Sequence, residues 1–316
     1  MKTVKILRLS LVLAALVFSG LTSCKKDKTS NPGDSNTTSI QNLAIDENQA
    51  NNSSDEALAD INTVLAANSG LIPAGGLPCN ATIDSMAIAK DTMTYYVTYN
   101  GLNCAGNLNR TGQIEISKHV GTKWWQPGAT VTYKYINFRV THVNTQKSMT
   151  LNGRKTYINL TGGLIFMIPL TRTSVTYKDS GYMNVTFYDS TTKSWNVRRQ
   201  ITYTKSENKF VMTVDGYGSA DGYDNLVLWG INRNGEQFYT QILQSVVHRQ
   251  ACQWDPCSGQ KKIMIPGGNK GATLTFGYDN DNQPITGDEC PTKFKVDWYK
   301  GSNSGTMYLF LHPTLF

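Results

Sequence analysis

The stretch WNVRRQITY, Trp195–Tyr203, alternates apolar and polar side chains with a period of two. In an extended chain, successive side chains point to opposite faces of a sheet. One face of this stretch is then apolar and carries Trp195, Val197, Ile201 and Tyr203. The other face is polar and includes Asn196 and Arg198. Such a strand is typical of an antiparallel sheet that covers a core on one side and meets water on the other.

The same alternation extends over most of the chain after Gly70. It is clear in Tyr182–Tyr188 and in Lys293–Tyr299. We therefore expect about fourteen strands, near residues 93–99, 112–120, 130–141, 148–159, 168–178, 182–188, 195–203, 210–214, 225–231, 237–248, 261–265, 272–278, 293–299 and 306–312. Residues typical of turns separate them at Asn152-Gly153, Asp189-Ser190-Thr191, Asn234-Gly235 and Gly267-Gly268.

One short helix is predicted before the strands, over residues 54–66. Ser54 is a favourable N-cap residue, and Leu58, Ile61 and Leu65 recur at helical spacing. No repeated strand–helix–strand pattern follows. The sequence therefore predicts an all-β domain over residues 54–316, which is either an antiparallel sandwich or a strongly curved open sheet, with one short N-terminal helix.

The N-terminal residues have the layout of a secretory signal. Residues 1–8 carry three positive charges, and residues 9–19 form an apolar segment that is shorter than the roughly 20 residues of a spanning helix. Leu21-Thr22-Ser23-Cys24 resembles the lipobox of bacterial lipoproteins. The resemblance implies a signal peptide over residues 1–23 and acyl chains such as palmitate on Cys24, and two or three such chains anchor a protein stably. The alternative is an ordinary signal peptide with an incidental cysteine.

Residues 24–53 start with Cys24 and continue as a polar segment without periodicity, which is typical of a flexible tether. We expect an outer-membrane lipoprotein of the cell envelope. Two lysines and one aspartate follow Cys24 directly, so the periplasmic and the surface face both stay open.

The charge of the chain argues against nucleic acid as a partner. Without residues 1–23, which carry three of the 30 basic residues, 27 basic and 23 acidic residues remain. This net charge of +4 is mild, and no Lys/Arg-rich stripe accompanies it.

Five cysteines follow the anchor, and an exported chain permits disulfides. Cys79 and Cys104 flank one strand region, so we expect them to pair. Near the C-terminus, Cys290 can pair with Cys252 or with Cys257, and one thiol is left over. A zinc site is not expected there, because no Cys-x-x-Cys spacing and no nearby ligand histidine support it.

Four segments carry short motifs in a fixed order: Cys79–Ile116, Pro127–Val140, Ile231–Ile242 and Cys252–Ile263. This order resembles a group of uncharacterised Bacteroidota lipoproteins, in which a cysteine pair brackets a strand and a second pair follows an Asn-Arg-Asn-Gly hairpin. The matching residues are Cys79, Cys104, Arg110, Thr111, Gly112, Pro127, Gly128, Asn137, Phe138, Asn234, Gly235, Cys252, Trp254, Gly259 and Cys290.

The resemblance covers most of residues 75–316. It implies the pair Cys252–Cys290, with Cys257 as the extra thiol, and it implies no activity because the group has none assigned. A similar local order around both cysteine pairs suggests a pseudo-duplicated sheet. The Trp124-Trp125 turn departs from the group.

Trp124 and Trp125 are the best candidates for ligand binding. Adjacent residues of a strand point to opposite faces, so at least one of these rings is expected to be exposed. An exposed tryptophan stacks on sugars or inserts at interfaces. The simpler interpretation places one ring in the core and the other over the edge of the sheet.

No catalytic or metal motif stands out. The chain has no Gly-x-Ser-x-Gly and no His-Glu-x-x-His. Its glutamates in the β region suggest no catalytic pair. Two acid-rich segments, Asp215–Asn225 and Asp279–Glu289, invite a calcium interpretation, but neither has EF-hand spacing and both are typical of turns. No catalytic residue, cofactor or metal is predicted.

Three functions are consistent with these features. The first is a non-catalytic lipoprotein of the envelope or surface that binds a glycan or a protein partner. The second is a hydrolase that acts on polysaccharide. The third is an accessory to envelope assembly or transport that holds a lipid-like ligand in a concave sheet.

Overall fold

The part of the protein that the structure describes contains a single antiparallel sheet. A computed structural model describes residues 38–67, 78–171, 173–207 and 209–312. Within these residues, fifteen strands hydrogen-bond into one sheet. Their bounds are β1 Ala81–Ala89, β2 Thr92–Leu102, β3 Leu108–His119, β4 Ala129–His142, β5 Ser148–Asn159, β6 Ser174–Phe187, β7 Thr192–Ser206, β8 Lys209–Gly216, β9 Gly218–Ala220, β10 Tyr223–Ile231, β11 Gln237–Arg249, β12 Pro256–Ile265, β13 Lys270–Tyr278, β14 Lys293–Lys300 and β15 Asn303–Phe310.

The strands follow one another almost in chain order. β1 to β7 pair consecutively, β7 then pairs with β10, and β10 to β15 pair consecutively. β8 pairs with both β7 and β11, and the short β9 pairs with β10. The predicted all-β class is confirmed, and the described strands form one sheet rather than the two sheets of a sandwich.

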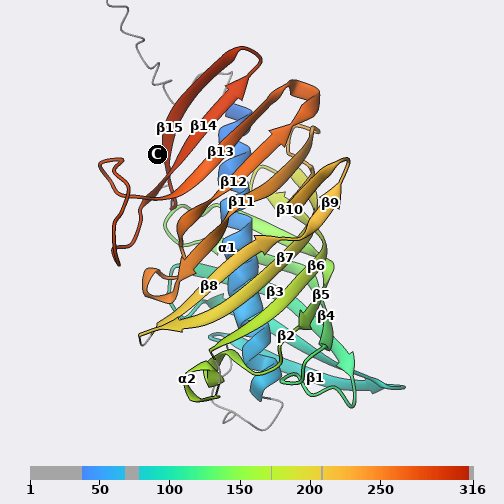
Figure 1. Cartoon of the computed structure of the whole chain (residues 1–316). Helices are drawn as coiled ribbons and strands as arrows, with labels where there is room; N and C mark the ends of the chain where they lie inside the picture. The colour runs from blue at the N-terminus through green and yellow to red at the C-terminus, as the bar shows by residue number, and fades with distance from the viewer. Residues whose placement is uncertain (1–37, 68–77, 172, 208, 313–316) are drawn as a thin grey trace, which may run out of the picture.

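A single long helix, α1 (Thr38–Ala67), lies inside the curve of this sheet. Figure 1 shows α1 running lengthwise through the molecule while the strands coil around it, from β1 at one end to β15 at the other. Only Thr38, Asn42 and Ala59 of the helix are exposed. We call the face of the sheet toward α1 the inner face and the opposite face the outer face.

The alternation in sequence produces the inner face. In β4, for example, Val131, Tyr133 and Tyr135 are buried, whereas Thr130 before them and Lys134 between the two tyrosines are exposed. The buried residues of the strands and the apolar residues of α1, such as Leu58 and Ile61, belong to one core. Burial of this apolar surface is the main force that curves the sheet around the helix.

The helix starts sixteen residues earlier than the predicted start at Ser54, so the tether prediction is wrong for residues 38–53. This segment is polar in sequence, but the sheet supplies partners for its polar groups. Thr240 donates a hydrogen bond to Glu47 at 2.6 Å, and Lys270 donates one to Ser39 at 2.9 Å. Buried polar groups are tolerated when they are paired, and no sequence pattern revealed these partners. Residues 1–37, including Cys24, lie outside the described residues.

Three of the four predicted turns are confirmed, and one is wrong. Asn152-Gly153 lies in the middle of β5. Gly153 has a φ of 148°, and a Cβ atom there would lie 2.4 Å from the backbone oxygen of Tyr182 on β6. The glycine therefore allows a close approach of two strands rather than a hairpin.

The predicted strands near 168–178 and 182–188 form the single strand β6. Its bounds are Ser174–Phe187, and Gly181 lies within it. Residues 168–171 are not extended, because α2 (Ile168–Thr171) follows a 3₁₀ turn, η1 (Ile165–Met167), at this position.

Buried charges join α1 to the inner face. Asp179 on β6 is fully buried and lies 3.3 Å from Lys155 Nζ and 3.1 Å from Arg199 Nη2. Arg199 reaches Asp55 on α1 at 2.6 Å. Burial alone would raise the pKa of Asp179, but Lys155 and Arg199 outweigh it and lower that pKa. Such groups are stable in a core only as a paired network.

Lys193 on β7 is a buried amine without such a partner. Its side chain is 1% exposed, and its Nζ has no hydrogen-bond partner among the described residues. The amine lies 4.5 Å from the ring centroid of Trp195 and 4.8 Å from that of Phe238. Burial lowers the pKa of Lys193 to about 8, although Glu47 and Asp46 on α1 act in the opposite direction.

Because of Lys193, we expect the free energy of unfolding to increase in mild alkali. Below pH 8 the amine is charged in both states, and burial of the charge penalises the folded state. Between pH 8 and the unfolded pKa of 10.5, the unfolded state binds more protons, so the free energy of unfolding increases, by on the order of 2 kcal/mol. Urea unfolding at pH 7 and pH 9.5 measures the rise. We expect Lys193→Met to lose it, and an equal rise in both proteins would contradict the assignment.

Candidate functional site

The structure places Trp124 in the core and not on the surface. Trp124 is 1% exposed, and its ring stacks on that of Tyr177 with centroids 5.6 Å apart. Its indole N–H donates a hydrogen bond to Asn62 Oδ1 on α1 at 3.2 Å. The prediction that Trp124 binds a ligand is therefore wrong. The two rings do not lie on a strand, because residues 120–128 form the turn between β3 and β4.

Trp125 is half-buried and packs against the core from outside. The Lys123 amine lies 5.9 Å from its ring centroid. Trp125 does not line either of the two pockets described below. The pair thus follows the simpler interpretation, with one ring inside the core and the other at its edge.

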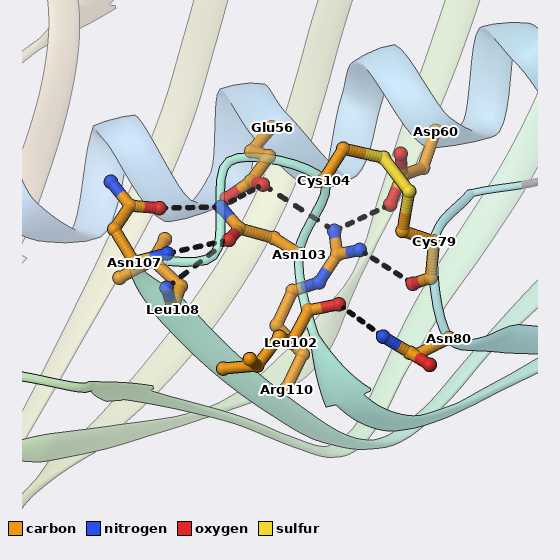
Figure 2. The surroundings of a disulfide bond; sticks show 10 residues. All are labelled: Glu56, Asp60, Cys79, Asn80, Leu102, Asn103, Cys104, Asn107, Leu108 and Arg110. Carbon is orange, nitrogen blue, oxygen red and sulfur yellow. Dashed lines mark hydrogen bonds and ion pairs between the residues drawn. A yellow bond between two sulfur atoms is a disulfide. The ribbon is translucent and has the colours of Figure 1, made fainter.

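The predicted disulfide Cys79–Cys104 is confirmed. Figure 2 shows that it ties the start of β1 to the loop after β2, beside the buried Arg110 of β3. Arg110 donates hydrogen bonds to Asp60 on α1 at 2.7 Å and to the backbone oxygen of Cys79 at 3.1 Å. Asn103 in the same loop donates to Glu56 at 2.8 Å. The arrangement fastens this end of the sheet to α1.

The pair Cys252–Cys290 is also confirmed, with Cys257 as the free thiol among the described residues. The disulfide fixes the long loop between β13 and β14. Arg249 binds the same loop through Asp288 at 3.2 Å.

The first acid-rich segment contains the end of β8, the short β9, a turn at residues 221–222 and the start of β10, and the second lies in the loop between β13 and β14. Within the described residues, no group of three or more histidine, cysteine, aspartate or glutamate side chains is arranged to hold a metal ion. Asp279 in the second segment accepts hydrogen bonds from the backbone N–H groups of Asp281 and Gln283, both at 2.8 Å. That is the usual role of aspartate in a turn.

The first acid-rich segment contributes to a pocket on the outer face. The pocket has a volume of about 490 Å³, within the range of small-ligand sites. Three parts of the chain line it: Asp221 and Tyr223 before and at the start of β10, Glu236, Gln237 and Tyr239 at the start of β11, and residues 265–268 at the turn η3 (Pro266–Gly268). We call it the outer pocket.

The segment 216–225 folds over the outer face because its backbone allows a tight turn. Asp221 and Gly222 have φ values of 50° and 82°, in the left-handed region that aspartate and glycine tolerate. Gly218 lies against the ring of Trp229, where a Cβ atom would be 2.6 Å from Cζ3. The segment covers a small second core of Leu226, Tyr239 and Met264, with Ala220, Tyr223 and Trp229 packed at its edge.

The aromatic lining of the outer pocket consists of Tyr223, which is half-buried, and Tyr239, which is 3% exposed and lies beside it. The centroids of Tyr223 and Tyr239 are 4.7 Å apart, with an angle of 39° between the rings. The Tyr239 hydroxyl donates a hydrogen bond to Asp221, and Gln237 donates to the same carboxylate. Burial and the bond to Asp221 raise the pKa of Tyr239 to about 12, so it remains a donor at neutral pH.

Glu236 provides the second carboxylate of the outer pocket. It lies 2.8 Å from Lys270 Nζ and accepts a hydrogen bond from Asn232 at 3.0 Å. These partners overcome the effect of burial and lower the pKa of Glu236. The pocket thus offers an aromatic surface beside two ionised or hydrogen-bonded acceptors and the Gln237 amide. This combination suits a ligand with an apolar face and hydroxyl groups on its rim.

A second hollow lies on the other side of the turn Asn232–Glu236. It has a volume of about 190 Å³ and is lined by α1 and by Arg233. Arg233 is already bound to Asp46 at 3.2 Å, to Thr191 at 2.7 Å and to Asp189. Because this hollow is smaller than the outer pocket and no aromatic residue lines it, we regard the outer pocket as the candidate site.

Sequence reasoning singled out part of this site for another reason. The Asp-Gly pairs of Asp215–Asn225 and the Asn234-Gly235 turn were visible signals of turns. No signal showed that these turns meet residues 265–268 in space. The aromatic residues of the pocket, Tyr223 and Tyr239, have no distinguishing motif in the sequence.

Comparisons with protein-family models, curated proteins and solved structures find no match to this chain. None of the described helices is long and apolar enough to cross a membrane. The candidate site therefore depends on its own geometry and chemistry.

Proposed function

We propose that the protein is a lipid-anchored lipoprotein of the cell envelope that binds glycan at the outer pocket without cleaving it. The observation that carries the proposal is the pair Tyr223 and Tyr239 beside Asp221, in a hollow separate from the main core. Sugar rings combine C–H faces with hydroxyl groups, so aromatic rings and carboxylate or amide acceptors bind them together. The concave shape supports a small or chain-like ligand better than a flat protein partner.

The pocket favours binding over hydrolysis. A glycosidase needs one carboxylic acid with a raised pKa to protonate the leaving oxygen. Glu236 has a lowered pKa and is held by Lys270 and Asn232. The concave inner face, where a lipid-like ligand was expected to fit, is occupied by α1.

A glycan array with the chain from Lys25 to Phe316 tests the proposal. We expect binding to at least one glycan class and a loss of affinity of about tenfold in Tyr223→Ala. The matched control is Tyr188→Ala, which removes an exposed tyrosine in the turn between β6 and β7, away from the pocket. Trp125→Ala should also bind like the unchanged protein. Absence of glycan binding, or equal affinity of Tyr223→Ala, would contradict the proposed function.

The membrane anchor is supported by the lipobox alone and has its own test. Cells that express the full chain should incorporate labelled palmitate into the protein and retain it in the membrane fraction. Cys24→Ala should lose both properties, because two or three acyl chains provide the anchoring energy. If Cys24→Ala still carries the label, the assignment of the anchor is wrong.

A further inference from the structure

One row of outer-face residues crosses neighbouring strands from the outer pocket toward the end of the sheet. Tyr239 on β11 is paired with Met264 on β12, and Met264 is paired with Gly271 on β13. Gly271 is paired in turn with Tyr299 on β14. Neighbouring strands lie about 4.8 Å apart, so the Cα atoms of Tyr299 and Tyr239 are about 14 Å apart along this row.

The Tyr299 ring covers the glycine in the middle of the row. Gly271 has no side chain, and a Cβ atom there would lie 2.8 Å from Tyr299 Oη and 2.9 Å from its Cε1. The tyrosine ring therefore lies across the glycine, toward Met264 and the outer pocket. Its side chain is half-buried, so part of the ring stays accessible. No charged side chain stands in the row between Tyr239 and Tyr299.

On the β10 side of Tyr239, the covering segment 216–225 blocks the continuation of the row. Trp229 on β10 is paired with Tyr239 and is the next outer-face residue in that direction. Gly218 of the covering segment lies directly against the Trp229 ring. A ligand longer than the outer pocket is therefore directed over Gly271 toward Tyr299.

We propose that the ligand is a linear oligosaccharide chain, with one unit in the outer pocket and a later unit on Tyr299. This inference rests on the proposed function and specifies its ligand. Because the Tyr299 ring lies toward Gly271, two to three strand spacings, about 10–14 Å, separate the two aromatic positions. This separation exceeds the reach of one monosaccharide and matches a short chain. Aromatic rings at separate positions add contacts only when the ligand spans both, so affinity depends on chain length.

The competing explanation is structural. An aromatic ring over a strand glycine also stabilises a sheet by covering exposed backbone. Under that explanation, Tyr299→Ala lowers stability and leaves the length dependence of binding unchanged. The two explanations therefore differ in a binding measurement and not only in a stability measurement.

Calorimetric titration with linear gluco-, xylo-, manno- and chito-oligosaccharides, from monosaccharide to hexasaccharide, tests the inference on the chain from Lys25 to Phe316. We expect the affinity of the unchanged protein to increase with length for the series that binds. Tyr299→Ala should lower hexasaccharide affinity about tenfold and leave the shortest binding ligand unaffected. Tyr299→Phe keeps the ring and should bind like the unchanged protein.

Tyr308→Ala is the matched control. Tyr308 on β15 is paired with Lys295 of β14, which lies four residues before Tyr299, so Tyr308 is outside the row. Its removal should not alter binding at any length. If Tyr299→Ala binds all lengths like the unchanged protein while Tyr223→Ala does not bind, the chain inference is wrong and the proposed function stands. If the unchanged protein binds none of the series and no array glycan, both are wrong.

Discussion

Asp179→Ala is expected to lower the free energy of unfolding by about 3–5 kcal/mol, because it leaves buried cations without their shared partner. Asp179 accepts hydrogen bonds from Tyr133 at 2.7 Å, from Lys155 at 3.3 Å and from Arg199 at 3.1 Å. After the substitution, Lys155 retains only the Ser54 hydroxyl, at 2.9 Å. Urea unfolding at neutral pH, followed by circular dichroism, measures the loss.

An exposed ion pair provides the control for this prediction. Lys295 and Asp297 on β14 lie 2.9 Å apart, with side chains 27% and 40% exposed. Pairs of this kind contribute about 0–1 kcal/mol, so Asp297→Ala should have a small effect. Similar losses in the two variants would show that the buried network does not hold α1 in the sheet.

Trp124→Ala is expected to cost about 3–5 kcal/mol, the range for removal of a large aromatic side chain from a core. The ring packs against both Tyr157 and Tyr177, with centroid distances of 5.2 and 5.6 Å. Its removal also deprives Asn62 Oδ1 of the indole donor. Thermal and urea unfolding measure this loss.

Trp125→Ala is the matched control for Trp124→Ala. Trp125 is half-buried at the edge of the core, so we expect a loss of only about 1 kcal/mol. The fraction of Trp124→Ala protein that stays folded should still bind glycan at the outer pocket, because Trp124 does not line it. A greater loss in Trp125→Ala than in Trp124→Ala would reverse the assignment of the two rings.

The strands were predictable because a strand that is buried on one face has apolar residues at every second position. In Lys293–Tyr299, the predicted apolar face of Phe294, Val296 and Trp298 is the buried face of β14. The hairpin at Asn234-Gly235 was predictable because few residues tolerate its backbone conformation. Both signals are local, so a single sequence contains them.

Other features depended on partners far away in the chain. Arg199 is a charged residue on the apolar face of Trp195–Tyr203. It can be buried because it forms ion pairs with Asp55 and Asp179. Residues 38–53 resemble a tether in composition, yet they are helical because the inner face pairs their polar groups. Asn152-Gly153 has the residues of a turn, but the close approach of β6 makes it part of a strand.

The candidate site shows the same limit. Its residues come from three turns between Asp221 and Gly268, and the tyrosine pair meets only when segment 216–225 folds over the outer face. Trp124 and Trp125 were more conspicuous in the sequence, but the turn before β4 directs the first ring inward.

The sequence by itself determined the all-β class, the positions of most strands, the cysteine pair Cys79–Cys104 and the expectation of a lipid anchor at Cys24. These follow from local chemistry: alternation, turn residues and a short motif at the N-terminus. Only the tertiary structure decided that one sheet coils around a 30-residue helix, which charges are buried, and where a pocket opens. The physical reason is that a charged group is buried only where partners from distant parts of the chain pair with it, and the spacing of neighbouring residues does not encode those partners.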